Sequence, residues 1–230
     1  RLAPSSEGVL SALGEAALAE GAPLEAVSAL SILARICPTV AGYRYQYGVA
    51  LARAGDPAAA IETLREADHL EPNRPATLLA LGSALVARQL FAEAVGVLAG
   101  ALSLAPDDLE AAARLAEAEA GADQPAKAEA HAQQVLGRLP GDATANLAMG
   151  MVRMQQGRYE EARTALARSL AGHPDSANAH YQMSLVCARL HDEAAAQQQL
   201  SLYRREVEKG ESRLHQVRAL TGFSGAGTQR

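Results

Sequence analysis

Small and large apolar residues recur along this chain at the same places every 34 residues. The prolines make the spacing plain, because they fall one period apart: Pro38, Pro72, Pro106, Pro140 and Pro174. A fixed period of this length is typical of a repeat architecture, in which each repeat is one small supersecondary element. The same register gives six repeats without an insertion: 7–40, 41–74, 75–108, 109–142, 143–176 and 177–210.

Inside each repeat the apolar positions predict two helices. A small residue recurs in the middle of the first helix: Gly14, Gly48, Gly82, Ala116, Gly150 and Ser184. The missing side chain lets the second helix approach closely, which offsets the roughly 1 kcal/mol that Gly costs inside a helix. Alanines at one position of the second helix, from Ala26 to Ala196, are predicted to supply the facing surface.

Turn and cap residues fall at the ends of these helices. Gly21, Gly55 and Gly157 mark the turn inside a repeat. Prolines then open the second helix, where their missing N–H is harmless: Pro23, Pro57 and Pro125. Four short polar residues are placed to cap the N-terminus of a helix: Asp56, Asp108, Asp142 and Ser176.

This spacing and this order of small and large residues resemble the tetratricopeptide repeat, a helix-turn-helix unit of 34 residues. The resemblance covers 7–210. It implies an all-α fold, a right-handed superhelical solenoid of six helix-turn-helix repeats. In such a solenoid each repeat contacts mainly its neighbours.

The two ends of the chain depart from the repeat. Residues 1–6 are predicted to be loose, and 221–230 (TGFSGAGTQR) to form a disordered tail. Apolar residues at three-four spacing continue past Tyr203, so the last helix either runs on or breaks at Gly210 into a further helix, 211–220. We interpret 211–220 as a capping helix, because a terminal repeat needs a polar outer face. A helical dimer seam is the alternative.

The fourth repeat has Glu119 at an apolar position, and the fifth has Arg153 at the equivalent place. Equivalent positions of adjacent repeats are lateral neighbours, so the two side chains could form a buried pair. The alternative is that both extend to the rim and reach water.

Composition narrows the class of partner. The net charge is −5 and the charges are interspersed, which argues against nucleic-acid binding by a basic stripe. No run of 18 apolar residues is present, so no membrane span is expected. The Ala-rich, Lys-poor composition suggests a bacterial source.

Cys37 and Cys187 lie in the first and last repeats, too far apart in a stacked array for a disulfide. We expect two free, buried thiols, which favours a cytoplasmic location. A periplasmic location stays open, because the chain begins at Arg1 and a signal segment could have been removed.

No catalytic, metal-binding or cofactor-binding motif is found. The six histidines lack metal-ligand spacing, the cysteines do not form a C-x-x-C pair, and no phosphate-binding loop or nucleophile elbow occurs. His180 occupies a core-type position, which favours a packing role. The sequence therefore predicts a protein that is not an enzyme and binds no cofactor.

The resemblance also implies which surface binds. First helices of such repeats line a concave groove, and the residues expected to face it are Tyr45, Val49, Arg53, Leu79, Ser83, Val86, Glu117, Leu147, Met151, Met154, Tyr181, Leu185 and Arg189. This set is more apolar than a solvated helix surface, and contiguous apolar surface marks a binding site. The larger side chains could instead fill space between repeats.

These observations predict a scaffold or adaptor for protein–protein interaction. Its groove would hold an apolar peptide or an amphipathic helix and so assist complex assembly. Two alternatives stay open: the substrate-recruiting repeat arm of a larger enzyme such as a glycosyltransferase, and a chaperone that shields an apolar client. Homo-oligomerisation through the groove or the last helix also stays open.

Overall fold

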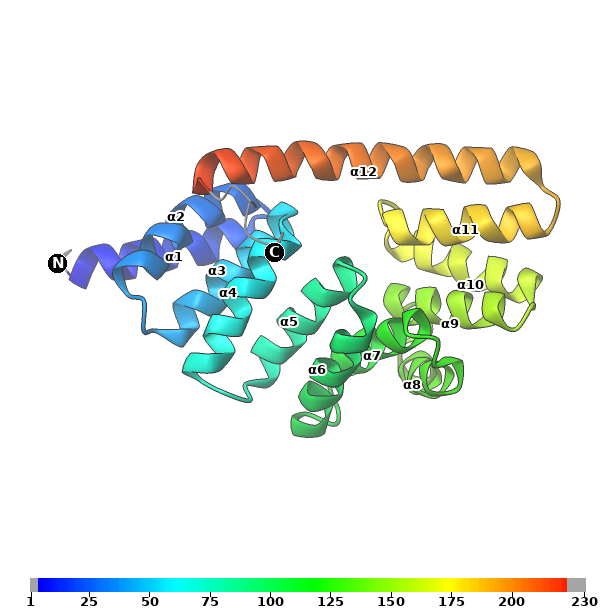
Figure 1. Ribbon diagram of the computed structural model, residues 1–230, viewed down its shortest axis with the longest axis horizontal. Helices are drawn as coiled ribbons and strands as arrows, with labels where there is room; N and C mark the ends of the chain where they lie inside the picture. The colour runs from blue at the N-terminus through cyan, green and yellow to red at the C-terminus, as the bar shows by residue number, and fades with distance from the viewer. Residues whose placement is uncertain (1–3, 223–230) are drawn as a thin grey trace, which may run out of the picture. The chain divides into compact units, whose positions relative to one another are not determined.

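The computed structural model of the protein describes residues 4–222, and within them it is all-α. Figure 1 shows the order of the helices. Their bounds are α1 Pro4–Ala19, α2 Pro23–Ile36, α3 Ala41–Ala54, α4 Pro57–Leu70, α5 Pro75–Ala87, α6 Phe91–Leu104, α7 Leu109–Gly121, α8 Pro125–Arg138, α9 Ala143–Gln155, α10 Tyr159–Gly172, α11 Ala177–Arg189 and α12 Glu193–Thr221. Each predicted repeat therefore holds a first helix with an odd number and a second helix with an even number.

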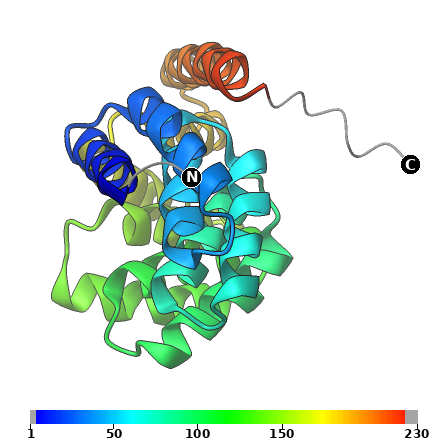
Figure 2. The same ribbon diagram turned by 90° about the vertical axis from the view of Figure 1, so that its left-hand side faces the viewer.

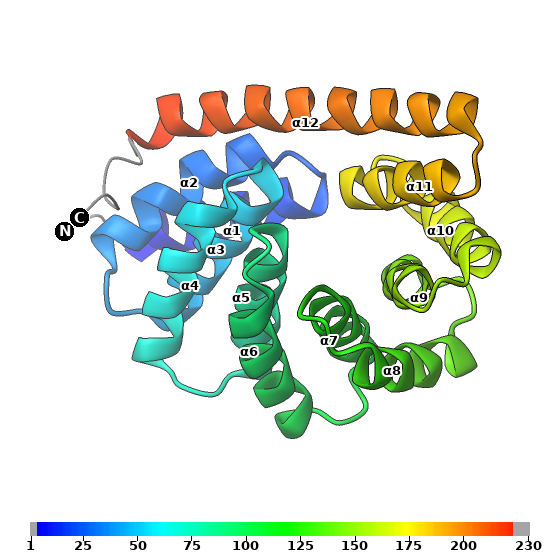
Figure 3. The same cartoon turned by 45° about the vertical axis from the view of Figure 1, so that its right-hand side comes forward.

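The helices belong to two compact units. Unit 1 contains α1 to α5 and the end of α12 from Gly210, and unit 2 contains α6 to α11 and the start of α12. Within unit 1, α2 packs against α3 and α4 against α5 (blue to cyan in Figure 2). Within unit 2, α6 packs against α7, α8 against α9 and α10 against α11 (Figure 3). Hairpin stacking is thus the same in both units.

The small residue in the first helix permits the close packing inside a hairpin. A Cβ atom added at Gly14, Gly48 or Gly150 would lie 2.5–2.6 Å from a side-chain carbon of Leu30, Leu64 or Leu166 respectively. Real Cβ atoms do not approach so closely, so a larger residue at these positions would require the facing leucine side chain to move. The facing group is a leucine of the second helix, where the alanines were expected.

The predicted caps are present. Oxygen atoms of Asp56, Asp108, Asp142 and Ser176 each accept a hydrogen bond from a backbone N–H in the first turn of the helix that follows. These bonds satisfy donors that a helix N-terminus otherwise leaves without a partner. The three predicted prolines are the first residues of α2, α4 and α8.

The turn inside each repeat has one residue in the left-handed backbone region, and these residues are again 34 apart. Three are the predicted glycines, Gly21 (φ 71°), Gly55 (φ 93°) and Gly157 (φ 74°). The other three are not glycine: Gln89 (φ 58°), Asp123 (φ 59°) and His191 (φ 60°). The turn geometry is thus kept where its preferred residue is missing.

At the C-terminal end the last helix runs on, which is the first of the two predicted forms. Helix α12 extends unbroken from Glu193 to Thr221, so the predicted capping segment 211–220 is its continuation and not a separate helix. An exposed Gly lowers helix stability by only about 1 kcal/mol, and the flanking residues are good helix formers. At the start, Pro4–Ser6 are the first residues of α1, and proline is favoured in a first helical turn. Residues 1–3 and 223–230, including most of the predicted tail, lie outside the described residues.

Candidate protein-binding surface

Eleven of the thirteen residues predicted to line the groove fall into three sets of equivalent positions on the first helices, and Val86 and Met154 share a fourth position. Along the chain these sets are Tyr45, Leu79, Ala113, Leu147 and Tyr181; Val49, Ser83, Glu117, Met151 and Leu185; and Arg53, Ala87, Gly121, Gln155 and Arg189. We call the surface that these sets mark the first-helix face. Burial along this face is uneven.

In unit 2 much of the first-helix face is buried. Leu147 and Met151 of α9 are each only 5% exposed, and they join a core cluster with Met183 and Cys187 of α11. Glu117 of α7 is 4% exposed. The expectation that these three side chains face a partner is therefore wrong: neighbouring first helices pack directly against one another and cover them.

A polar bridge accompanies this closure. The Glu117 carboxylate accepts hydrogen bonds from Arg114 Nη1 at 3.1 Å and from Asn178 Nδ2 at 3.2 Å. Asn178 lies in α11, two repeats further on. Gln155 of α9 also donates to the backbone oxygen of Ala120 at 2.8 Å. The first helices of unit 2 are thus linked by polar contacts as well as by the apolar cluster.

The exposed part of this face in unit 2 lies on α11. Tyr181 is 40% exposed and Leu185 36% exposed, and Arg189 continues the row one turn later. Met154 of α9 is half-buried. The Tyr181 ring also contacts the Tyr203 ring of α12, with 5.4 Å between centroids. An apolar, aromatic strip therefore remains available on α11.

In unit 1 the face is more open. Tyr45, Val49, Leu79 and Ser83 are half-buried. Two residues differ from them. Val86 of α5 is 6% exposed and does not face a partner, so its predicted role is also wrong. Arg53 of α3 is exposed, but its Nη1 donates to the backbone oxygen of Leu18 at 3.0 Å, which ties α3 to α1.

Glu119 and Arg153 do not pair with each other. Glu119, 3% exposed, binds His131 of α8 at 2.7 Å. Arg153 lies 2.7 Å from Glu129 of α8 and 3.5 Å from Glu161 of α10. Both the predicted pair and the predicted extension of Glu119 to the rim are wrong, because each side chain has its partners on second helices: Glu119 on α8, and Arg153 on α8 and α10.

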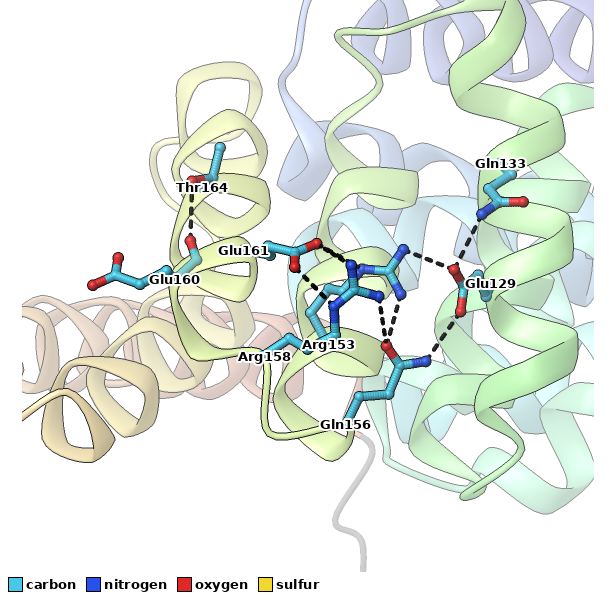
Figure 4. A network of polar contacts seen from close by, with 8 residues as sticks. All are labelled: Glu129, Gln133, Arg153, Gln156, Arg158, Glu160, Glu161 and Thr164. Carbon is cyan, nitrogen blue, oxygen red and sulfur yellow. Dashed lines mark hydrogen bonds and ion pairs between the residues drawn. The ribbon is translucent and has the colours of Figure 1, made fainter.

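Arg153 is the centre of a network at the α8–α9–α10 junction (Figure 4). Gln156 accepts from Arg153 at 2.7 Å and donates to Glu129 at 3.0 Å, while Arg158 donates to Glu161 at 2.6 Å. The hydrogen bond from Arg153 holds the pKa of Glu129 below its ordinary value. A cavity of about 340 Å³ adjoins the network. Arg153 and Glu161 in its lining neutralise each other, so the network is best explained as an inter-repeat connection.

The comparison with known families identifies the fold. Models of the tetratricopeptide repeat match residues 11–75, 51–118 and 119–185. The chain is a tetratricopeptide repeat protein. A search of the curated proteins gave no match.

Solved structures share this tetratricopeptide fold at low sequence identity. A tetratricopeptide repeat protein from Parabacteroides merdae is 14% identical, with a TM-score of 0.62 over 95% of this chain and 98% of that one. PilF from Pseudomonas aeruginosa is 19% identical, with a TM-score of 0.59 over 90% and 97%. MamA from Desulfovibrio magneticus, from its residue 41 onward, is 22% identical, with a TM-score of 0.51 over 74% and 96%. These likenesses establish the fold.

His180 and the two cysteines of this tetratricopeptide repeat protein have the surroundings of packing residues. His180 is 5% exposed, and its ring nitrogens contact Gln199 and the backbone oxygen of Pro174. Both thiols are free, and burial raises the pKa of each, but Cys37 is half-buried where a buried thiol was expected. Across the described part of the chain, no three His, Cys, Asp or Glu side chains are placed to share a metal ion. Among residues 4–222, no helix combines the length and apolar character needed to cross a membrane.

Proposed function

We propose that this chain is a non-enzymatic scaffold that binds an apolar peptide or an amphipathic helix of another protein. Tetratricopeptide repeat proteins are in general scaffolds for protein–protein interaction, which supports the class of function. The observation that carries the proposal is the strip on α11, where Tyr181 and Leu185 are exposed one helical turn apart.

The strip has the chemistry of a binding site. Tyr181 offers a large apolar ring together with a hydroxyl group, a combination enriched where proteins meet. Leu185 lies on the same side of α11, and Arg189 places a cation at the end of the row. A partner with two or three apolar side chains at helical spacing and an acidic residue beyond them would match this order.

The half-buried residues of unit 1 form a second, weaker candidate strip. Tyr45 and Leu79 share the position of Tyr181 on their helices, but both side chains are half-buried whereas Tyr181 is exposed, and the Arg74 guanidinium also lies 5.9 Å from the Tyr45 ring centroid. We therefore place the main contribution to binding on α11.

The test is selection of binders from a displayed library of 16-residue peptides, with the wild-type chain as bait. Selected peptides should bind wild type and lose at least tenfold in affinity toward Tyr181→Ala/Leu185→Asp, since anchor side chains of this size contribute more than about 1.4 kcal/mol. Leu104→Asp is the matched control, because Leu104 is 49% exposed on α6 of the same unit. Peptides that bind the double variant as well as wild type would show that the site lies elsewhere.

A further inference from the structure

A second apolar surface lies on α1, away from the first-helix face. Val9 is 64% exposed, Leu13 is 51% exposed, and Ala16 is exposed as well. The spacing i, i+4, i+7 puts the three side chains on one side of the helix. We call these three residues the α1 stripe. Other sides of α1, dark blue in Figure 2, pack against α2 and α3.

The positions equivalent to the α1 stripe are covered in later repeats. In α5 they are Thr77, Leu81 and Ala84, which are 1%, 5% and 2% exposed. The corresponding residues of α7 and α11 are no more than 7% exposed: Ala111, Leu115, Ala118, Ala179, Met183 and Val186. The stripe is therefore a packing surface in those repeats and a free surface in the first.

The same element covers these positions each time, namely the second helix of the preceding repeat. Helix α4 packs on α5, α6 on α7, α8 on α9 and α10 on α11. Three of these helices have a leucine at one equivalent place, preceded by a small or β-branched residue: Ala101–Leu102, Val135–Leu136 and Ser169–Leu170. Leu136 packs against the core cluster that contains Ala145, the equivalent of Val9, and so does Met149, the equivalent of Leu13. The molecule thus shows the kind of helix that fits the stripe.

We propose that the α1 stripe is a docking site for an amphipathic helix of another protein. That helix takes the place of the preceding second helix, and it presents a leucine preceded by a small or β-branched residue. Apolar surface of this kind, on adjacent helical turns, is surface that proteins usually cover. The proposal concerns a surface separate from the α11 strip and does not depend on it.

A second copy of the chain is a poor occupant. The second helix that could pack head-to-tail is α12, and at the place of the leucine it has Arg204, preceded by Tyr203. Arg204 is exposed, as expected for the polar outer face of a terminal repeat. Burying its guanidinium on Val9 and Leu13 would leave a charge without a partner. The complementary leucine is therefore not supplied by α12.

The probe for this site is a fluorescent peptide with the sequence of Gln124–Leu139, which contains Val135 and Leu136. A bridge between positions 130 and 134 keeps it helical, because an isolated helix this short is marginal in water. Both positions are exposed in the protein, away from Leu136. Fluorescence anisotropy should show saturable binding to the full wild-type chain. The peptide with Val135→Asp and Leu136→Asp should show none.

Two variants of the chain locate the site. Leu13→Glu should weaken binding of the probe at least tenfold without changing the melting temperature, because Leu13 is exposed. Leu220→Glu is the matched control at a leucine that is 54% exposed on α12, and it should leave binding unchanged. Equal affinities for wild type and Leu13→Glu would overturn the proposal. So would a wild-type dimer in analytical ultracentrifugation that Leu13→Glu converts to a monomer, because the occupant would then be a second copy.

Discussion

Leu79 in unit 1 and Leu147 in unit 2 occupy the same position two repeats apart, yet only Leu147 is fully buried. Leu79 is half-buried on α5, whereas Leu147 is 5% exposed and packs within the cluster that joins α9 to α11. The next position behaves alike, with Val49 half-buried and Met151 5% exposed. These positions of the repeat are therefore part of the core on α9 of unit 2 and partly accessible on α3 and α5 of unit 1.

The difference in burial follows from the size of the side chains that lie between neighbouring first helices in each unit. In unit 2 a small residue, Ala113, shares the position of Leu147 on α7, and Asn178 reaches Glu117 across two repeats. Short side chains let first helices approach, and the larger side chains between them then become core. In unit 1 the same positions have Tyr45 and Leu79, which leave less room for such an approach.

The largest expected effect comes from truncating the two leucines. Leu147→Ala should destabilise unit 2 by about 2–4 kcal/mol, the range for a buried leucine that leaves a cavity. Leu79→Ala should cost about 1 kcal/mol or less, since much of that side chain already contacts water. Urea unfolding followed by circular dichroism measures the loss, and hydrogen exchange of peptides from α5 and α9 assigns it to a unit.

Equal losses of unfolding free energy for Leu147→Ala and Leu79→Ala would mean that the two positions are equally buried in solution.

The Leu147→Ala variant also makes a prediction about peptide binding. Leu147→Ala should leave the affinity of peptides selected on α11 within about twofold, provided that the variant is still folded, because Leu147 is covered.

The repeat, its caps and its turns were predictable because their causes are local. Gly48, Asp56 and Pro57 act on neighbouring residues of one hairpin, so their meaning can be read from sequence spacing. The closure of the first-helix face was not predictable, since the spacing places Met151 on that face but says nothing of how near the next first helix lies. The partner of Arg153 was missed for the same reason. Its choice of Glu129 depends on helix positions that only the packed structure fixes.

The turns give a second comparison between the units, with smaller effects. In the turns inside the repeats of unit 1 the left-handed residues are glycines, Gly21 and Gly55, while unit 2 has Gln89, Asp123 and His191 as well as Gly157 at the equivalent places. Gly21→Ala should cost about 1 kcal/mol, because a Cβ is disfavoured at positive φ although it meets no atom within 4 Å. Gln89→Gly should raise the free energy of unfolding by about 0.5 kcal/mol. Glycine relieves the strain of a positive φ, and this gain exceeds the cost of the extra backbone entropy that glycine loses on folding.

Thermal and urea unfolding of both turn variants measure these changes. Gln133→Gly, at an exposed position inside α8, controls for the cost of glycine and should destabilise by about 1 kcal/mol. If Gln89→Gly destabilises as much as Gln133→Gly, the left-handed conformation of Gln89 is not strained.

The smallest expected effect is a pH dependence of the stability of unit 2. The hydrogen bond to the buried Glu119 raises the pKa of His131, so the folded state favours the imidazolium more than the unfolded state does. This stabilisation is present in full below the ordinary histidine pKa of about 6.5 and is lost as pH rises through the higher pKa of the folded state. Because the His131 ring is partly exposed, we expect a loss of less than about 1 kcal/mol.

Hydrogen exchange of α7 and α8 between pH 6 and pH 8, corrected for intrinsic rates, should therefore show falling protection, while α3 and α4 of unit 1 stay constant. Glu119→Gln keeps the shape of the side chain and removes its charge, so it should flatten the dependence in α7 and α8. A slope that persists in Glu119→Gln would contradict the assignment of the effect to the His131–Glu119 pair.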